Sequence, residues 1–251
     1  MNQVYAEREF ARESAFQGIW RDDINEVFAD VAKYYDRANM YATLGLIDGL
    51  RQRFISTMQL EPNYRVLDVC AGTNVIGIDL LKRQPTLEVH AIDRSEAMQQ
   101  VGQQLAAKRG FQIHSTISDV HELPFPDNHF DMVTLQWATR HIRAIKVFSE
   151  IHRVLKPGGH FYHCDMLRPA NKMVEQIYYL YLKAIMALIP RAFGSGSAAF
   201  RCRESFVNAI RLFYSTEELS HVLTELQFSD VVGRSVLAGT VGFHKACKAA
   251  A

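Results

Sequence analysis

The stretch VLDVCAGTNVIGIDLL, residues 66–81, decides the fold class that this chain indicates. It is an apolar run of strand length, followed by a turn of small residues and an apolar run of helical length. In an open α/β sheet, such a strand–turn–helix unit places a ligand beyond the carboxyl end of the strand. Its turn holds one glycine, Gly72, where nucleotide-binding turns usually hold two or three. The rest of the sequence therefore has to indicate which nucleotide the turn accepts.

Short apolar runs alternate with helical stretches from residue 64 onward, which indicates a right-handed, mostly parallel α/β sheet. Two closing runs, 229–237 and 239–247, follow each other without a helix and can pair only as a hairpin. LKPGG, residues 155–159, is typical of a helix stop followed by a turn. We predict a doubly wound, seven-stranded, mostly parallel sheet with a final antiparallel hairpin. The earlier strands are expected at 64–70, 87–93, 111–119, 130–137 and 159–166, and helices at 95–108 and 142–155.

Two helical segments are expected outside this alternation. Residues 1–60 are interpreted as a helical N-terminal cap, and residues 61–251 as one Rossmann-like domain. Within that domain, residues 169–212 are interpreted as a helical lid, with helices at 171–189 and 203–211. The apolar stripe of the cap follows helical spacing at Ile24, Val27, Phe28, Val31 and Tyr35.

Composition and charge exclude several classes of protein. The chain has 251 residues, 48% of them hydrophobic, so it can bury a substantial core. Its formal charge is +1, from 28 basic and 27 acidic residues, and no block of like charges occurs. A sequence-independent nucleic-acid binder needs a clustered basic surface, so we expect no nucleic-acid partner.

The sequence also indicates a cytoplasmic setting. Residues 1–20 carry charges throughout and lack the apolar core of a signal peptide. The most apolar later stretch, 177–190, contains Lys183 and is short for a bilayer span. The four cysteines form no C-x-x-C pair, so we expect neither a disulfide framework nor a bound metal. They stand at positions 70, 164, 202 and 247.

Three kinds of cofactor compete for the turn after residue 69. A phosphate-binding loop needs lysine and serine or threonine after its second glycine, but Ile78 and Asp79 follow Gly77. A dinucleotide site needs G-x-G-x-x-G, which the turn does not supply. S-adenosylmethionine carries no phosphate, so one glycine that allows close approach suffices. The alternative is an ordinary α/β turn that binds no ligand.

Carboxylates at two further strand ends favour the adenosyl cofactor. Asp93 ends the strand expected beside 64–70, where a carboxylate suits both ribose hydroxyls. Asp119 follows the next strand and can accept the adenine amino group. Alternatively, Asp93 is a solvated strand end.

Several motifs resemble those of class I S-adenosylmethionine-dependent methyltransferases. The resemblance is closest to the ubiquinone/menaquinone C-methyltransferases of the UbiE/MenG type, and it extends over residues 25–247. LPFPDNHFD and RVLKPGG are shared by many small-molecule methyltransferases, whereas the N-terminal and arginine motifs are specific to this type. The motifs are VAKYYDRANMYATLG (31–45), VLDVCAGTN (66–74), DRSEAM (93–98), LPFPDNHFD (123–131), TRHI (139–142), RVLKPGG (153–159) and LAGTVGFHK (237–245).

The resemblance implies S-adenosylmethionine as cofactor and a set of residues that bind it. Ala71 and Asn74 stand where the family reads glycine, and Gln136 where it commonly has serine. Asparagine tolerates a left-handed backbone better than most residues, so the turn can keep its conformation. We expect the Asn74 side chain near the methionine end of the cofactor. The implied cofactor residues are Asp68, Ala71, Gly72, Thr73, Asn74, Asp93, Arg94, Asp119, Val120 and Gln136.

Catalytic candidates follow from the chemistry of methylating an aromatic carbon. The ring hydroxyl has to lose its proton so that electron density reaches the carbon. Arg140, which matches the family's arginine, is predicted to stabilise the phenolate. His141 and Asp165 are candidate proton acceptors, and Tyr35, with Asp36, lies in a helix expected to fold over the pocket. The alternatives are a surface-paired arginine, a structural histidine, a turn-capping aspartate and a core tyrosine.

The leading hypothesis is an S-adenosylmethionine-dependent methyltransferase that C-methylates a quinol-like or phenolic, apolar small molecule. One alternative is a natural-product methyltransferase of the same fold. Another is a protein that binds the cofactor or a relative without transferring methyl. The apolar helix 174–189 is plain core, the wall of an apolar substrate pocket, or a contact with a membrane surface. Peripheral membrane contact and a homodimer are left open as further associations.

Overall fold

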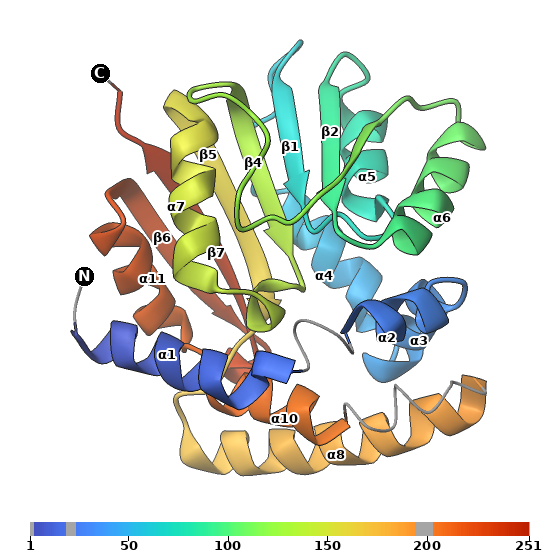
Figure 1. Cartoon of the computed structure of the whole chain (residues 1–251), viewed down its shortest axis with the longest axis vertical. Coiled ribbons are helices and arrows are strands. Elements are labelled where there is room, and N and C mark those ends of the chain that lie inside the picture. Colours follow the sequence, from blue (N-terminus) through green and yellow to red (C-terminus); the bar gives the residue numbers. More distant parts are fainter. Residues whose placement is uncertain (1–2, 19–23, 194–202, 251) are drawn as a thin grey trace.

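The computed structural model describes residues 3–18, 24–193 and 203–250 and is built around a seven-stranded sheet (Figure 1). The strand order is β3-β2-β1-β4-β5-β7-β6, with β1 to β5 parallel and β7 antiparallel to both of its neighbours. The predicted doubly wound sheet with a final antiparallel hairpin is therefore confirmed. The strands are β1 (Arg65–Val69), β2 (Glu88–Asp93), β3 (His114–Ile117), β4 (Phe130–Gln136), β5 (Leu155–Met166), β6 (Phe228–Val236) and β7 (Val241–Lys248).

Helices cover both faces of the sheet. Alternate residues of each strand point to opposite sides, so each face carries apolar side chains that the helices bury. Leu67 and Val69 of β1 pack in the core beneath α7 (Ala144–Val154) and α11 (Thr216–Glu225). Val66 packs on the other face, and both faces are buried, as expected of a parallel sheet. The helices on that second face are α4 (Leu46–Ile55), α5 (Val75–Arg83) and α6 (Glu96–Ala107).

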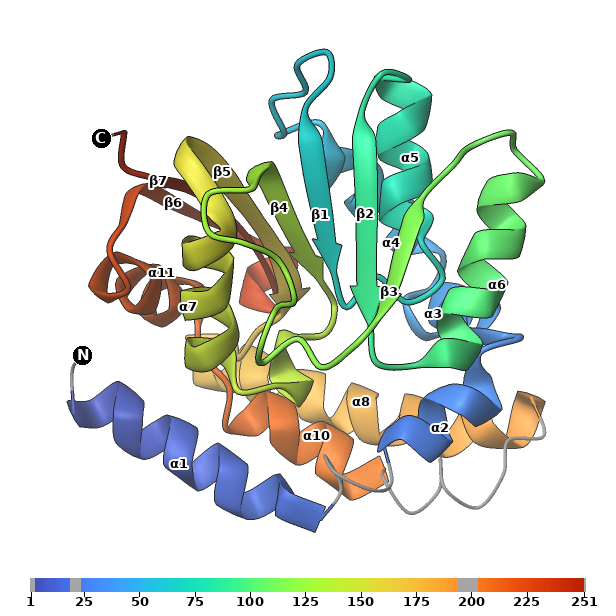
Figure 2. The ribbon, with the colours of Figure 1, turned by 45° about the horizontal axis from the view of Figure 1, so that its top comes forward.

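The remaining helices lie across the carboxyl ends of the parallel strands (Figures 1 and 2). Two that are far apart in the sequence meet there, since the Tyr181 hydroxyl of α8 donates to the Ala42 carbonyl of α3. No described helix has the length and apolar character that a membrane span needs. These helices are α1 (Gln3–Gly18), α2 (Ile24–Val31), α3 (Tyr35–Ala42), α8 (Lys172–Phe193) and α10 (Arg203–Arg211).

Two strands differ in length from those predicted. Strand β5 starts at Leu155, so the glycines that predicted a turn lie within the strand. Gly158 has φ +78°, and the pairing with β4 shifts register there, which identifies a bulge rather than a loop. Strand β3 is confined to His114–Ile117 at the edge of the sheet, where β2 is its one neighbour among the described strands.

Candidate active site

The turn between β1 and α5 has the left-handed conformation that its glycine position requires. Cys70, Gly72 and Asn74 have φ of 55°, 53° and 59°. A Cβ on Gly72 would lie 3.3 Å from Cε of Met98 and be strained at this φ. Asparagine is among the residues that adopt positive φ most readily, so Asn74 can replace glycine before α5.

The side chain of Asn74 does not lie where we expected it. It is fully buried against α6, where its Oδ1 accepts a hydrogen bond of 2.9 Å from Nε2 of Gln99. Gln99 Nε2 also donates to the Gly72 carbonyl, at 2.9 Å, and Ser115 Oγ donates to Gln99 Oε1. A Cβ on Gly102 would lie 2.8 Å from Asn74 Cγ, so glycine in α6 makes room for the amide. Asn74 therefore stabilises the turn on the side that faces α6, away from the cleft.

Asp93 at the end of β2 is held by two backbone N–H groups. Its Oδ2 accepts from the Gly72 N–H and its Oδ1 from the Ser95 N–H, both at 2.8 Å. Each oxygen keeps further acceptor capacity, which matches two neighbouring hydroxyls. Burial raises the pKa of Asp93, and the two backbone hydrogen bonds oppose this rise.

A cleft opens above these strand ends and contains most of the predicted cofactor residues. Four predicted residues lie outside its lining. Asp68 accepts from Thr134 Oγ1 at 2.8 Å, and burial raises its pKa to about 7. The Thr73 hydroxyl lies 3.1 Å from both carboxylate oxygens of Asp36, while Ala71 and Asn74 belong to the turn beneath. The predicted residues that line the cleft are Gly72, Asp93, Arg94, Asp119, Val120 and Gln136.

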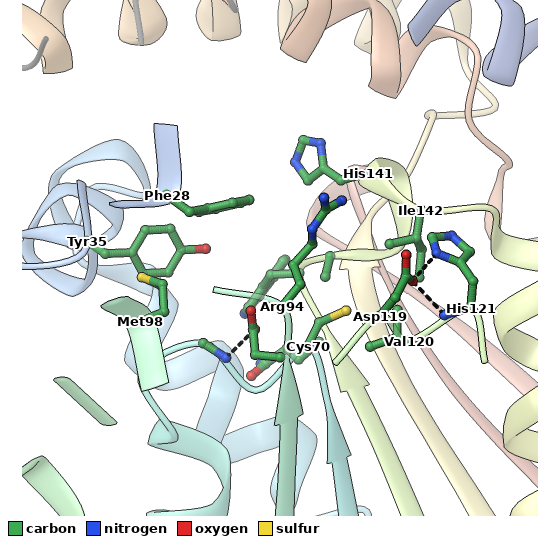
Figure 3. Close-up of a pocket in the computed structure, with 15 residues that line it drawn as sticks. Phe28, Tyr35, Cys70, Arg94, Met98, Asp119, Val120, His121, His141 and Ile142 are labelled. Atoms are coloured by element: carbon green, nitrogen blue, oxygen red, sulfur yellow. Dashed lines mark hydrogen bonds and ion pairs between the residues drawn. The ribbon is translucent and has the colours of Figure 1, made fainter. Parts of the chain in front are cut away.

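Figure 3 shows Phe28, Tyr35 and Met98 on the side of the cleft opposite His121 and Ile142. Phe28 packs edge-to-face on both Tyr35 and His141, at 6.1 and 6.3 Å between ring centroids, so α2 covers the cleft. Phe28 is part of an ordinary apolar stripe, a pattern that does not indicate a ligand site. The other lining residues that we did not predict are Cys70, Met98, His121, Trp137, Ala138 and Ile142.

Asp119 is oriented by His121. His121 Nε2 accepts from the Arg143 N–H at 3.0 Å, so the ring proton is on Nδ1, which donates to Asp119 Oδ1 at 2.5 Å. Burial alone would raise the pKa of Asp119, but the hydrogen bonds from His121 outweigh it and lower the pKa. Asp119 is therefore an ionised acceptor at the rim of the cleft.

Arg140 and Asp165, which were expected at the same edge of the sheet, form a buried ion pair that was not predicted. Arg140 Nη1 donates to Asp165 Oδ1 at 2.5 Å and to the Trp137 carbonyl at 2.7 Å. Asp165 also accepts from the N–H groups of Thr139, at 2.6 Å, and Met166, at 2.7 Å. Three donors thus hold the carboxylate of Asp165 in place.

Helix α1 contributes a residue that sequence reasoning missed. Arg12 is fully buried, and its Nη2 lies 3.3 Å from the carbonyl oxygens of Thr139 and Arg140 and 3.2 Å from that of Ile142. Its Nη1 forms an ion pair with Glu9. Arg12 therefore fixes the backbone of the loop that carries Arg140.

A chain of buried hydrogen bonds supports the same loop from inside the sheet. Thr139 Oγ1 lies 2.8 Å from His163 Nε2, the Nδ1 atoms of His163 and His244 are 3.2 Å apart, and His244 Nε2 lies 3.0 Å from the Thr216 carbonyl. A carbonyl only accepts, so His244 is protonated on Nε2, His163 on Nδ1, and Thr139 is the first donor. Burial lowers the pKa of His163 well below its usual value and that of His244 to about 4, so both rings are neutral.

His141 faces the cleft and is also neutral. Burial, followed by the charges of Arg140 and Arg12, lowers its pKa well below the usual value. Its ring lies 5.1 Å from that of Phe206, and within the described part of the chain its Nε2 has no hydrogen-bond partner.

A second cavity, of about 270 Å³, adjoins the cleft. Tyr35 and Trp137 line both, so these two side chains stand between them. The second cavity is lined mainly by apolar residues of α3, α4 and α8, and Arg140 is its charged member. Two ligands can thus be held next to each other, one against the strand ends and one among the helices.

The strand order, the glycine turn and the carboxylate after β2 define the class I methyltransferase fold. Solved structures agree on the fold. Phosphoethanolamine N-methyltransferase 2 of Haemonchus contortus is 16% identical, with a TM-score of 0.62 over 80% of this chain and 52% of that one. The [4+2]-cyclase SpnF is 15% identical, with a TM-score of 0.54 over 81% of this chain and 82% of that one. The fold alone therefore does not fix the reaction.

The sequence identifies the family. The chain belongs to the ubiE/COQ5 methyltransferase family, whose sequence model matches residues 17–248, and it is an S-adenosylmethionine-dependent methyltransferase. It is 32% identical over 227 residues to a demethylmenaquinone methyltransferase of Staphylococcus aureus, covering 89% of this chain and 92% of that protein. The cleft fits the cofactor, since Asp93 and Asp119 supply acceptors and the turn needs no phosphate contact.

Proposed function

We propose that this methyltransferase methylates a ring carbon of a quinol-like or phenolic, apolar acceptor of the demethylmenaquinone type. The observation that carries the proposal is the mainly apolar cavity that shares Tyr35 and Trp137 with the cofactor cleft and contains Arg140. Apolar walls with a few polar groups suit an aromatic ligand. The name of the Staphylococcus aureus relative supports this class of acceptor.

In this proposal Arg140 stabilises the phenolate and Asp165 positions Arg140. The cofactor, which Asp93 and Asp119 would hold, would supply an electrophilic methyl group. The acceptor hydroxyl gives up its proton so that the ring carbon can be methylated. The ring carbon then loses its own proton and the ring oxygen is reprotonated, so one proton is released for each methyl group transferred. Arg140 has a buried Nε without a partner among the described residues, which leaves a donor for the acceptor.

The proton passes toward the cleft side in this scheme. Asp165 already accepts three hydrogen bonds, so it is a positioning residue. The pKa of His141 lies well below its usual value, so its ring stays neutral and is a weak base, and the proton of the acceptor leaves toward the solvent side of the cleft. Burial raises the pKa of Tyr35, so its hydroxyl stays protonated where the cleft and the cavity adjoin.

Methyl transfer from labelled S-adenosylmethionine to a panel of reduced quinones and simple phenols tests the function. We expect label in the carbon skeleton of an alkylated naphthoquinol or benzoquinol, located by mass spectrometry. Label on oxygen, or on none of the acceptors while the cofactor binds, would contradict C-methylation of a quinol.

We further propose that the outer face of α8 rests on a lipid surface from which the apolar acceptor enters. Met173, Ile177, Leu180 and Leu188 are 60–69% exposed and follow one helical stripe, while the opposite face of α8 lines the acceptor cavity. An exposed apolar stripe is typical of an interaction surface. One helix would thus link the lipid surface to the acceptor.

Sedimentation with vesicles of phosphatidylethanolamine and phosphatidylglycerol tests this contact. The double variant Ile177→Glu/Leu180→Glu should lower the vesicle-bound fraction several-fold, because two apolar contacts are replaced by charges. Phe10→Glu on α1, where Phe10 is 70% exposed, is the matched control and should bind as the wild type does. Equal binding of all three proteins would rule out α8 as the contact.

A further inference from the structure

Three tyrosines of α8 differ in how their hydroxyl groups are satisfied. The Tyr179 hydroxyl donates to Glu175 Oε1 at 3.0 Å, and the Tyr181 hydroxyl donates to the Ala42 carbonyl. The Tyr178 hydroxyl is shielded from solvent and has no hydrogen-bond partner in residues 3–18, 24–193 and 203–250. Buried hydroxyls in folded proteins nearly always have a partner, so this one calls for a ligand atom.

The place of Tyr178 indicates which ligand supplies that atom. Tyr178 lines the apolar cavity together with Arg140 and Tyr181. Arg140 and Asp165 both act electrostatically on Tyr178, so the hydroxyl lies near the buried ion pair. Arg140 Nε is likewise buried without a partner in the described chain. Two donors without acceptors thus share one cavity.

We infer that the Tyr178 hydroxyl donates a hydrogen bond to the same acceptor oxygen that Arg140 stabilises, an inference that rests on the proposed function. Tyr178 is then a catalytic residue that, with Arg140, forms a two-donor site for a phenolate. Donors aimed at an oxygen that gains charge during the reaction lower the barrier, because the hydrogen bond strengthens as the charge develops. The ligand class is a ring bearing an ionisable hydroxyl group.

The tyrosine hydroxyl acts as a donor and not as the base. Burial raises its pKa far above the usual value, an effect that the charge of Arg140 only partly opposes. The proton of Tyr178 therefore stays on its oxygen while the proton of the acceptor leaves. The other two tyrosines already donate to protein oxygens and are not available for this role.

Tyr178→Phe tests the inference, because phenylalanine keeps the ring and removes only the hydroxyl. We expect kcat to fall by about 10- to 100-fold with cofactor affinity unchanged, since the bond matters mainly in the transition state. Tyr179→Phe is the matched control in the same helix but outside the lining of the cavity, and we expect it to keep kcat within about threefold, because its hydroxyl donates to Glu175. An unchanged kcat in Tyr178→Phe would overturn the inference.

A second measurement is independent of methyl transfer. 1-Naphthol changes its absorbance on ionisation, so its pKa can be followed when it is bound to the wild type and to both variants with S-adenosylhomocysteine present. We expect the bound pKa to lie below that of free 1-naphthol in the wild type and to rise in Tyr178→Phe alone, by about tenfold in the ionisation constant. If quinols are not methylated but this rise is seen, the proposed function fails and the donor site stands. If quinols are methylated and the bound pKa is equal in all three proteins, the donor site fails alone.

Discussion

The cofactor cleft and the acceptor cavity are built from different parts of the chain. Backbone and side chains at the ends of β1, β2 and β4 form much of the cleft, whereas α3, α4 and α8 supply most of the cavity. Backbone hydrogen bonds such as that from Gly72 to Asp93 anchor the cleft to the sheet. The cavity depends on the side chains of packed helices. Its specificity can therefore change while the cofactor site remains intact.

Tyr35 and Trp137 line both the cofactor cleft and the acceptor cavity, so the independence of the two sites can be tested by substitutions on either side of them. Trp137 has φ 57°, a conformation that a bulky residue rarely adopts, and its side chain lines both the cleft and the cavity. A substitution confined to one site should change the affinity for one ligand. A substitution in the loop that carries Trp137 and Arg140 should change the rate of methyl transfer.

The largest effect is expected for Arg140→Ala. Loss of one preorganised donor to the phenolate should lower kcat by about 10²-fold or more, with cofactor affinity nearly unchanged. Single-turnover methylation and calorimetry measure the two quantities. Arg140→Lys should recover only part of the rate, since an ammonium does not reproduce the guanidinium geometry.

Arg140→Ala also leaves Asp165 buried without its cation, so a thermal melt has to accompany the kinetics. Arg140→Lys keeps a positive charge beside Asp165 and serves as the folded comparison. Turnover close to wild type in a folded Arg140→Ala protein would remove Arg140 from the chemistry.

The second effect is a pH dependence of stability that comes from the buried histidines beneath the loop that carries Arg140. The pKa of His244 is about 4 in the folded protein and near 6.5 in the unfolded chain, so between these values the unfolded chain binds more protons. The free energy of unfolding should therefore fall as pH falls from 6.5 to 4, by on the order of 3 kcal/mol from His244 alone.

Urea unfolding between pH 7 and pH 4.5 measures this dependence. His244→Gln should flatten it, whereas His221→Gln should not, because His221 lies on α11 outside the chain of hydrogen bonds. Equal slopes for both variants would show that the buried pair does not control acid stability.

The third effect separates the two sites most directly. Asp93→Ala should weaken S-adenosylmethionine binding by about 1.5–3 kcal/mol, because hydrogen bonds to a charged acceptor are lost. Binding of 1-naphthol in the cavity should be unchanged, since Asp93 does not line it. Calorimetry with each ligand provides the measurement, and loss of both affinities would contradict the independence of the sites.

The smallest effect is expected for Asn74→Gly. The Asn74 amide contacts Gln99 and not the cleft, and glycine adopts φ 59° without strain, so cofactor affinity should change by less than about threefold. A loss of tenfold or more in cofactor affinity, measured by calorimetry, would show that the hydrogen bond from Gln99 to Asn74 sets the geometry of the turn.

Sequence patterns predicted much of the cleft, because its residues stand at the ends of strands that periodicity identifies. The positions of Asp93, Asp119, Arg140 and Asp165 at strand ends follow from that rule, whereas the ion pair of Arg140 with Asp165 does not. Arg12 could not be predicted, since it contacts a loop 127 residues later through the packing of α1. The predicted direction of the Asn74 side chain was also wrong, because the actual direction depends on the small size of Gly102 in α6. Tertiary packing decides both.

The acceptor cavity was predicted only as one of three alternatives for the apolar helix 174–189. Tyr178, Tyr179 and Tyr181 are indistinguishable in the sequence, and only the placement of Glu175 and Ala42 shows that two of their hydroxyls are occupied. The contact of His163 with His244 depends on the register of β5 with β7, which the hairpin prediction left open.

The hydrogen-bond chain through His163 and His244 has a consequence for where protons can travel. It begins at a hydroxyl donor, Thr139, and ends at a peptide carbonyl, Thr216, which fixes the tautomer of both rings. A peptide carbonyl does not pass a proton on, and each ring nitrogen is already committed as donor or acceptor. This series of hydrogen bonds therefore does not conduct protons through the sheet. A proton released by the acceptor has to leave through the cleft, toward bulk water.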